Sequence, residues 1–405
     1  YDSFILKKLS EKSLDTAVKK IIKKFKYNND RIIFQEYLEK PDMSGVIFTR
    51  DINNLAPYYV FNYDLSGKTN LITGGKKNIS QKTIIIHRDY NKVPHKFKKL
   101  LVICKKLEKV LRSDSLDIEF GVKKNRIYIF QVRPISNFKK TSDKIINSIL
   151  TNIEKKIIKL QKKSPIIDGS TTIFSNMSDW NPAEMIGSTS DNLAISMYEE
   201  LITDNIWAKQ RSKYGYKIVN FNPLMVTFAF SPYIDIRVDL NSFLPNKISK
   251  KLQIKTLNYL IKKLKKNPEQ HDKIEFNLIP TCNSKDLNYR LSKFLKKDEV
   301  KKYGDILIDL TNNILVEKKT NPFLKDINDI MYLKKKLEDK KFYKSHPIQN
   351  IYFLVQLCKN YGTLPFSGIA RTAFITTSLL KDLVSTGALT EERISSFYKN
   401  IKSFS

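Results

Sequence analysis

Residues 116–134 contain two runs in which apolar and polar side chains alternate, and this alternation constrains the fold more than any other part of the chain. Successive side chains of a strand point to opposite faces of a sheet. With a three-residue loop at 124–126, the pattern predicts an antiparallel hairpin with one apolar face. Its cross-strand pairs would be Ile118 with Val132, Phe120 with Phe130 and Val122 with Tyr128. A slip of one residue would bury the charged side chains, so the pattern fixes the register.

The opposite face of this hairpin would pair Asp117 with Arg133 and Glu119 with Gln131. A carboxylate, an amide and a guanidinium on one face are the groups that hold a metal ion and a polyphosphate. The alternative is a solvated outer face of an ordinary hairpin, because half-exposed antiparallel sheets are common.

The composition indicates a protein of two or three domains, with 405 residues and 41% hydrophobic side chains. A formal charge of +31 usually suggests nucleic acid, but only 11 of the 72 basic residues are Arg. The lysines are spread along every predicted helix, and no zinc-finger or RNA-recognition signature is present. We therefore expect solvated helix faces and no nucleic-acid partner.

Three widely spaced cysteines, Cys104, Cys282 and Cys358, show no metal-ligand or redox spacing, which favours a reducing, cytoplasmic location. No apolar run approaches the roughly 20 residues that span a bilayer, so we expect no membrane span. The chain begins with Tyr1 and has no evident start signal, so we interpret it as part of a longer protein.

The hydrophobic periodicity predicts an α+β fold with two parts: residues 1–137, and a mostly helical domain at 138–405. The predicted elements of the first part are a helix at 14–25 capped by Ser13, strands at 31–38, 45–50, 57–63, 69–73 and 82–87, a helix at 95–112 and the hairpin. Those of the second part include helices at 138–163 and 248–266, strands at 225–230 and 233–240, and two or three helices at 347–403.

The second part offers several candidate polar sites, each with a structural alternative. Asn181, Pro182 and Glu184 fit a helix cap, but with Asp179 beside them they could also hold a polar ligand. Arg371 is a rare Arg in a Lys-dominated chain, which hints at a site that needs planar bidentate geometry.

Two further residues of this part are candidates for chemistry. Arg237 stands between Asp235 and Asp239 on the polar face of an alternating run, either as an anion clamp or in a surface ion-pair ladder. His271 precedes Asp272, as an oriented acid–base pair or simply in a surface loop.

Three strings in the first third of the chain resemble the ATP-grasp domain of the pyruvate phosphate dikinase and phosphoenolpyruvate synthase family. They are IFQEY at 33–37, MSGVIFTRD at 43–51, and the hairpin strings LDIEF and IYIFQVRPI. The resemblance implies ATP and Mg²⁺ as cofactors and places the second part of a nucleotide-binding domain at 1–137. Asn62 departs from the family, which tends to carry an acidic residue near this point.

The same resemblance implies roles for individual residues. Glu119 would coordinate Mg²⁺, and Gln131 would contact the metal or the phosphate oxygens. Arg133 would bind the phosphates as a bidentate donor, oriented by Asp117. The adenine would lie at Gln35, Glu36 and Tyr37, which could equally belong to a plain buried strand.

Further strings, SDWNPAEMIG, PYIDIRVDLNSF, HDKIEF and GTLPFSGIAR, resemble a subgroup encoded with surface-polysaccharide genes, which includes the L-glutamine kinases of capsule phosphoramidate biosynthesis. This implies an ATP-dependent kinase that acts through a phosphohistidine on a mobile domain, phosphorylates the amide nitrogen of L-glutamine and releases AMP and phosphate. The residues expected in catalysis are Arg133, Arg237 and His271, and those expected to bind the acceptor are Asp179, Asn181, Glu184, Arg237 and Arg371.

The chain departs from the family plan in two respects. It lacks the glycine-rich opening half of the ATP-grasp domain, and its four histidines, His87, His95, His271 and His346, have no phosphocarrier context. We therefore expect the phosphohistidine domain outside this chain and no turnover by residues 1–405 alone. Two alternatives stay open: a phosphoenolpyruvate synthase-like enzyme with another acceptor, or a non-catalytic nucleotide-binding relative.

Overall fold

The computed structural model describes residues 6, 10–25, 31–32, 34–67, 81–135, 142–162, 164–278, 284–316, 321–339 and 346–400. The chain divides into two compact units, Tyr1–Thr151 and Asn152–Ser405. The boundary lies within helix α3 (Asp143–Leu160), whereas the sequence placed it at residue 137. The α+β class is confirmed, with antiparallel sheets and many helices.

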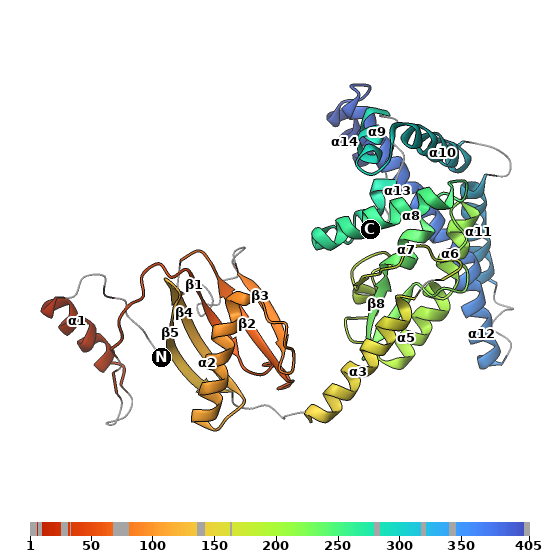
Figure 1. Ribbon diagram of the computed structural model, residues 1–405. Helices are drawn as coiled ribbons and strands as arrows, with labels where there is room; N and C mark the ends of the chain where they lie inside the picture. The colour runs from red at the N-terminus through yellow and green to blue at the C-terminus, as the bar shows by residue number, and fades with distance from the viewer. Residues whose placement is uncertain are drawn as a thin grey trace. The chain divides into compact units, whose positions relative to one another are not determined.

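The described residues of the first unit form a five-stranded antiparallel sheet in the order β3-β2-β1-β4-β5 (Figure 1). Its strands are β1 (Met43–Phe48), β2 (Tyr58–Asp64), β3 (Lys82–His87), β4 (Leu116–Lys123) and β5 (Arg126–Pro134). Helix α2 (His95–Leu111) packs on one face of this sheet, and α1 (Glu11–Ile22) precedes it along the chain.

Helix α2 buries one apolar stripe against the sheet. Phe97, Leu100, Leu101 and Cys104 recur at the spacing of one helix face, and all four are buried. They pack on strand residues that point to the same side, such as Phe120, which is fully buried. Each fully buried large side chain contributes roughly 1.5–3 kcal/mol to folding, so this stripe fixes which face of the sheet is covered.

The hairpin of β4 and β5 has the predicted register at its polar end and a different one near its turn. Asp117 pairs with Arg133 and Glu119 with Gln131 as predicted, but Phe120 pairs with Ile129 instead of Phe130. The turn has two central residues with positive φ, Lys124 (49°) and Asn125 (64°), because this tight turn matches the twist of the strands. Phe130 is left without a pairing partner on β4 and is accommodated as a β-bulge next to Glu119 and Phe120.

Two other predictions about the first unit are wrong, and one lies outside the described residues. The expected strand at 31–38 is irregular chain over 34–39, where the segment does not join the sheet although its sequence suits a strand. Helix α1 begins after Ser10, whose side chain and that of Ser13 close a capping box, so Ser13 is not the cap itself. The expected strand at 69–73 falls outside the described part of the chain.

The second unit is mostly helical, with a small sheet in the order β6-β8-β7 among its described residues. Its strands are β6 (Phe174–Ser175), β7 (Met225–Phe228) and β8 (Ser231–Asp235). Its described α-helices after α3 are α4 (Pro182–Met185), α5 (Asn192–Tyr198), α6 (Ile206–Lys213), α7 (Ile236–Ser242), α8 (Lys250–Lys266), α9 (Ser284–Ser292), α10 (Lys297–Leu315), α11 (Pro322–Leu337), α12 (Pro347–Leu357), α13 (Leu364–Ser385) and α14 (Glu391–Asn400). Shorter helical turns are η1 (Glu199–Thr203), η2 (Pro268–Gln270), η3 (Ile274–Leu278) and η5 (Cys358–Thr363).

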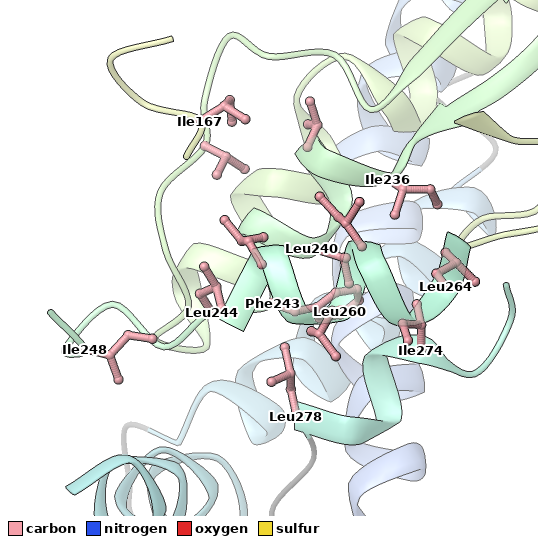
Figure 2. Packing of buried hydrophobic residues seen from close by; sticks show 14 of the residues in the cluster. Ile167, Ile236, Leu240, Phe243, Leu244, Ile248, Leu260, Leu264, Ile274 and Leu278 are labelled. Carbon is pink, nitrogen blue, oxygen red and sulfur yellow. The ribbon is translucent and has the colours of Figure 1, made fainter. Parts of the chain in front are cut away.

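The core of this unit forms around α7 and α8 (Figure 2). Ile236 and Leu240 of α7 are fully buried, and Leu260 of α8 lies against them. Ile274 and Leu278 of η3 close the cluster from another side. The cluster therefore fixes the positions of α7 and η3, which carry charged side chains on their other faces.

The predicted strand at 233–240 is correct only as far as Asp235. There the chain turns into helix α7, because the Asp235 carboxylate accepts hydrogen bonds from the amides of Arg237 (3.0 Å) and Val238 (3.3 Å) as an N-cap. Every residue of α7 is buried, so its polar side chains do not mark a solvated face. A fully buried short helix can imitate the alternation of a strand.

Candidate functional site

The polar face of the first sheet, opposite α2, brings together the residues predicted to bind the metal and the phosphates. Arg133 Nε donates to Asp117 Oδ2 at 2.7 Å, and Glu119 lies directly across from Gln131 on the same face. The Asp117 side chain is 13% exposed and that of Arg133 is 54% exposed. The ion pair therefore has a mostly buried acceptor and a donor that remains reachable from solvent.

Glu119 is the half-buried carboxylate of this face. Burial raises its pKa above the ordinary value, nearby Arg133 lowers it, and Asp117 raises it further. Asp117 Oδ1 is buried and has no hydrogen-bond partner among the described residues. An unsatisfied carboxylate oxygen beside a second carboxyl group is an arrangement that a cation would stabilise.

Polar residues recur in line with Glu119 on the far side of Val46. Val46 pairs with Glu119 on one side and with Asn62 on the other, and Asn62 pairs with Thr83. The hydroxyl of Thr83 donates to Asn62 Oδ1 at 2.7 Å. Asn62 thus shares the face of the predicted ligands, and sequence reasoning missed Thr83 because the partner of its strand was not known.

These residues fit Mg²⁺ only together with a phosphate ligand. Nowhere in the described ranges do three or more His, Cys, Asp or Glu side chains gather closely enough to hold a metal ion by themselves. Mg²⁺ is commonly held by one or two carboxylates, phosphate oxygens and water. Asp117, Glu119 and Gln131 supply that kind of incomplete oxygen set.

The predicted adenine residues do not lie in the sheet. Gln35, Glu36 and Tyr37 are exposed and belong to irregular chain, so they are not parts of a buried strand. The chain that follows them passes over the polar face, because a Cβ at Gly121 would meet the side chains of Leu38 and Phe130 at 2.8 and 2.7 Å.

A buried charged cluster forms the second candidate site, in the helical unit. Arg211 of α6 donates to Asp179 Oδ2 at 2.5 Å, to Asp239 Oδ1 at 3.0 Å and to the hydroxyl of Ser242. Its guanidinium lies 3.8 Å from the centre of the Phe243 ring. Both carboxylates raise the pKa of Arg211 against the effect of burial, so this guanidinium stays charged.

Arg371 of α13 adds a second guanidinium to this cluster. It is 5% exposed, its Nε donates to the hydroxyl of Tyr216 at 3.1 Å, and its guanidinium carbon lies 4.7 Å from the Phe243 ring centre. Its Nη2 is buried without a partner in the described part of the chain. A buried donor left unpaired costs about 1–3 kcal/mol, which a ligand oxygen would recover.

Glu275 of η3 completes the cluster and was missed by the sequence analysis, which singled out His271 and Asp272 in the same string. Burial and the neighbouring Asp179 raise the pKa of Glu275 to about 7, although Arg371 and Arg211 lower it. The available signal was its position directly after Ile274, at the edge of an apolar run.

Asp179 is held in the cluster by a strained turn. Trp180 and Asn181, which follow it, both have positive φ (54° and 27°), and the carbonyl of Trp180 accepts from the hydroxyl of Tyr198. Such backbone conformations are uncommon outside glycine and persist only where the surroundings enforce them. The strain therefore fixes the direction of the Asp179 side chain toward Arg211.

Asn181 and Glu184 have the capping geometry that was the structural alternative for this motif. Asn181 Oδ1 accepts from the amide of Glu184 at 3.2 Å at the start of α4, and Pro182 occupies the first helical position. The Glu184 side chain is exposed.

Arg237 does not form the predicted clamp between Asp235 and Asp239. Its guanidinium donates to the carbonyl oxygens of Leu160 (2.5 Å), Lys162 (3.2 Å) and Gly169 (3.1 Å), near the C-terminal end of α3. Asp235 caps α7 and Asp239 pairs with Arg211. The predicted clamp was wrong because α7 is a helix, in which neighbouring residues point in different directions.

His271 also has a local environment different from the predicted acid–base pair. Its Nδ1 lies 3.0 Å from the carbonyl oxygen of Pro268, and its own carbonyl accepts from the hydroxyl of Ser178 at 2.8 Å. The backbone of His271 thus supports the segment that carries Asp179, while its ring is engaged with its own turn.

Comparison with models of known protein families gives no match, and comparison with curated proteins gives none either. Within the described residues, no helix is both long and apolar enough to cross a membrane.

Proposed function

We propose that this chain belongs to an ATP-dependent phosphotransferase that binds Mg·ATP on the polar face of its sheet and a small-molecule acceptor at the charged cluster of its helical unit. The observation that carries the proposal is the pairing of Asp117 with Arg133 beside Glu119 with Gln131. In this proposal the sheet unit is the second part of an ATP-grasp domain, as its resemblance to the phosphoenolpyruvate synthase family implies.

The side chains of the polar face suit the two charges of Mg·ATP. Arg133 uses Nε for Asp117, which leaves its two Nη groups for phosphate oxygens. Glu119, Asp117 Oδ1 and Gln131 would hold Mg²⁺, which neutralises the charge on the phosphates when it is bound. Asp117 keeps the Arg133 guanidinium oriented, because the salt bridge fixes one edge of it.

The acceptor would bind where Arg211 and Arg371 meet Asp179, Asp239 and Glu275. Asp179 and Arg371 were predicted for this role, and the structure brings both into one cluster through Phe243 and Glu275. The free Nη2 of Arg371 would donate to an acceptor oxygen.

The resemblance of these segments supports L-glutamine as the acceptor, with its amide nitrogen phosphorylated through a phosphohistidine carrier, and AMP and phosphate released. It also supports a role in capsule biosynthesis in the cytoplasm, where ATP is supplied.

Mg·ATP binding by the 405-residue chain tests the nucleotide part of the proposal. We expect saturable binding in calorimetry that requires Mg²⁺ and weakens at least tenfold in Glu119→Ala and in Arg133→Ala. Arg126→Ala is the matched control, because Arg126 is an exposed arginine at the other end of β5. Equal affinity of all three variants, or no binding of Mg·ATP, would contradict the proposal.

The acceptor is identified by a screen. With a phosphohistidine domain present, ATP-dependent formation of AMP is measured across small amides, amino acids and sugars. L-Glutamine should give the highest rate, and an Asp179→Asn variant should raise its KM. A sugar or a keto acid as the best substrate would replace the amide acceptor.

A further inference from the structure

The charged cluster of the helical unit has an excess of negative groups. Three carboxyl groups, on Asp179, Asp239 and Glu275, are grouped with two guanidinium groups, on Arg211 and Arg371. If all three carboxyls were ionised, the cluster would carry one net negative charge. Isolated buried charge is costly, so protonation of one carboxyl group is favoured in the empty cluster and becomes complete below pH 7.

Hydrogen bonding decides which carboxyl group holds most of this proton. Arg211 donates to Asp239, and this hydrogen bond lowers the pKa of that carboxyl group against the effect of burial. In the described part of the chain, no hydrogen bond joins Arg211 or Arg371 to Glu275. Burial and Asp179 also raise the pKa of Asp239, so Asp239 and Glu275 share the proton, and the lack of a hydrogen bond from either guanidinium favours Glu275.

Among the described residues, the cations that act on the Glu275 carboxyl are the guanidinium groups of Arg211 and Arg371. The groups that act on its carboxyl are Asp179 before α4, Arg211 of α6, and Arg371 of α13, with Asp239 of α7 as a further neighbour. Ile274 and Leu278 hold η3 in the core, which fixes the backbone position of Glu275 (Figure 2). At the same time Arg371 Nη2 is buried without a partner, which indicates a missing ligand oxygen in this cluster.

We propose that this cluster binds ligands carrying a protonated primary amine, with the ammonium group taking the place of the proton that Asp239 and Glu275 share. On binding, the Glu275 carboxyl releases its proton to solvent and pairs with the ammonium group. For a simple amine the charge then balances in both states, because the bound ammonium and the two guanidinium groups match three carboxylates; the α-carboxylate of L-glutamine must be matched outside these groups. The inference deepens the acceptor site of the proposed function and does not depend on the nucleotide site.

Proton release on ligand binding is the measurement that tests this exchange. Calorimetry of the chain with L-glutamine and with propylamine, in buffers of different ionisation enthalpy, gives the number of protons released. We expect about one half at pH 7, rising toward one at pH 6 and falling toward zero at pH 8, as a group with a pKa of about 7 requires.

The variant Glu275→Gln should abolish the release and weaken amine binding at least tenfold. Glu269→Gln is the matched control, since Glu269 is an exposed glutamate on the neighbouring turn η2. If Glu275→Gln does not fold, the pH profile of proton release by the native chain decides the question.

Each outcome has a distinct meaning. L-Glutamine binding without proton release would overturn the exchange and leave the proposed function standing. Propylamine binding with proton release, but no L-glutamine binding, would support the exchange and remove L-glutamine as the acceptor. No binding of either amine would overturn the inference, while Mg·ATP binding would still decide the nucleotide part.

Discussion

Replacing Arg211 with Met should destabilise the helical unit by about 3–5 kcal/mol at pH 7, the range found when one partner of a buried ion pair is removed. Arg211 is 5% exposed, and its partners Asp179 and Asp239 have side chains that are 18% and 2% exposed. Methionine preserves much of the volume over Phe243, so the loss reflects the two carboxylates left without a cation more than a cavity.

The two tryptophans make this measurement specific to the helical unit. Trp180 and Trp207 are the only ones in the chain, and both lie in the second unit. Urea unfolding followed by their fluorescence therefore reports this unit separately from the sheet. Lys209→Met, on an exposed position of the same helix α6, controls for the change in helix propensity and should cost less than about 0.5 kcal/mol.

The pH dependence of this loss separates electrostatics from packing. Burial raises the pKa of Asp239 and Arg211 lowers it, so without Arg211 the folded state would bind a proton on Asp239 more tightly than the unfolded chain does. Stability of the variant relative to the native chain should therefore rise as the pH falls from 7 to 5. A loss below about 1 kcal/mol, or a larger loss that does not change with pH, would refute the reasoning.

Three further predictions concern other parts of the chain. Gly45→Ala should destabilise the sheet unit by about 1–3 kcal/mol, because its Cβ would stand 2.1 Å from the carbonyl oxygen of Asn62; faster amide hydrogen exchange in β1 and β2 would show it. Burial raises the pKa of Asp326 from 3.8 to about 6, so the folded chain binds this proton more tightly than the unfolded chain does. The free energy of unfolding should therefore fall as the pH rises from about 4 to 6. Urea unfolding should show that Asp326→Asn removes this fall, and an unchanged pH profile would contradict the prediction. Arg237→Met should lower stability by about 2–4 kcal/mol, because the guanidinium of Arg237 donates to carbonyl oxygens around α3. Calorimetry should show amine affinity within twofold of that of the native chain. A large loss of affinity at retained stability would instead support Arg237 as a ligand-binding clamp.

Sequence reasoning located the sheet face but not its local geometry. The alternation of β4 and β5 was enough to pair Asp117 with Arg133, since any other register would bury charge. The β-bulge could not be predicted, because it follows from a two-residue turn in place of the expected three-residue loop. The sequence does not show the positive φ values of Lys124 and Asn125 that mark this turn. The strand expected at Gln35 depended on a partner strand, and propensity alone does not supply one.

In the helical unit, the sequence indicated single candidate residues but not the cluster that they form. Arg371 stood out in the sequence because arginine is rare in this chain, and it lies in the charged cluster. Arg211 shares this rarity and Glu275 lies at the edge of an apolar run, but neither signal shows that they meet, which depends on the tertiary packing of α6, η3 and α13. Arg237 was misassigned because a buried helix was interpreted as a strand with one polar face.

The bulge beside Glu119 and Phe120 lies in the middle of the hairpin and separates the pairing of its polar end from the pairing near its turn. The unpaired residue of β5 lies between these two paired segments. A single-residue insertion or deletion near the turn can therefore be accommodated at the bulge. The turn at Lys124 can then change in length while the side chains of Gln131 and Arg133 stay on the polar face. A library of hairpin lengths should accordingly tolerate changes on the turn side of this point and reject them on the other.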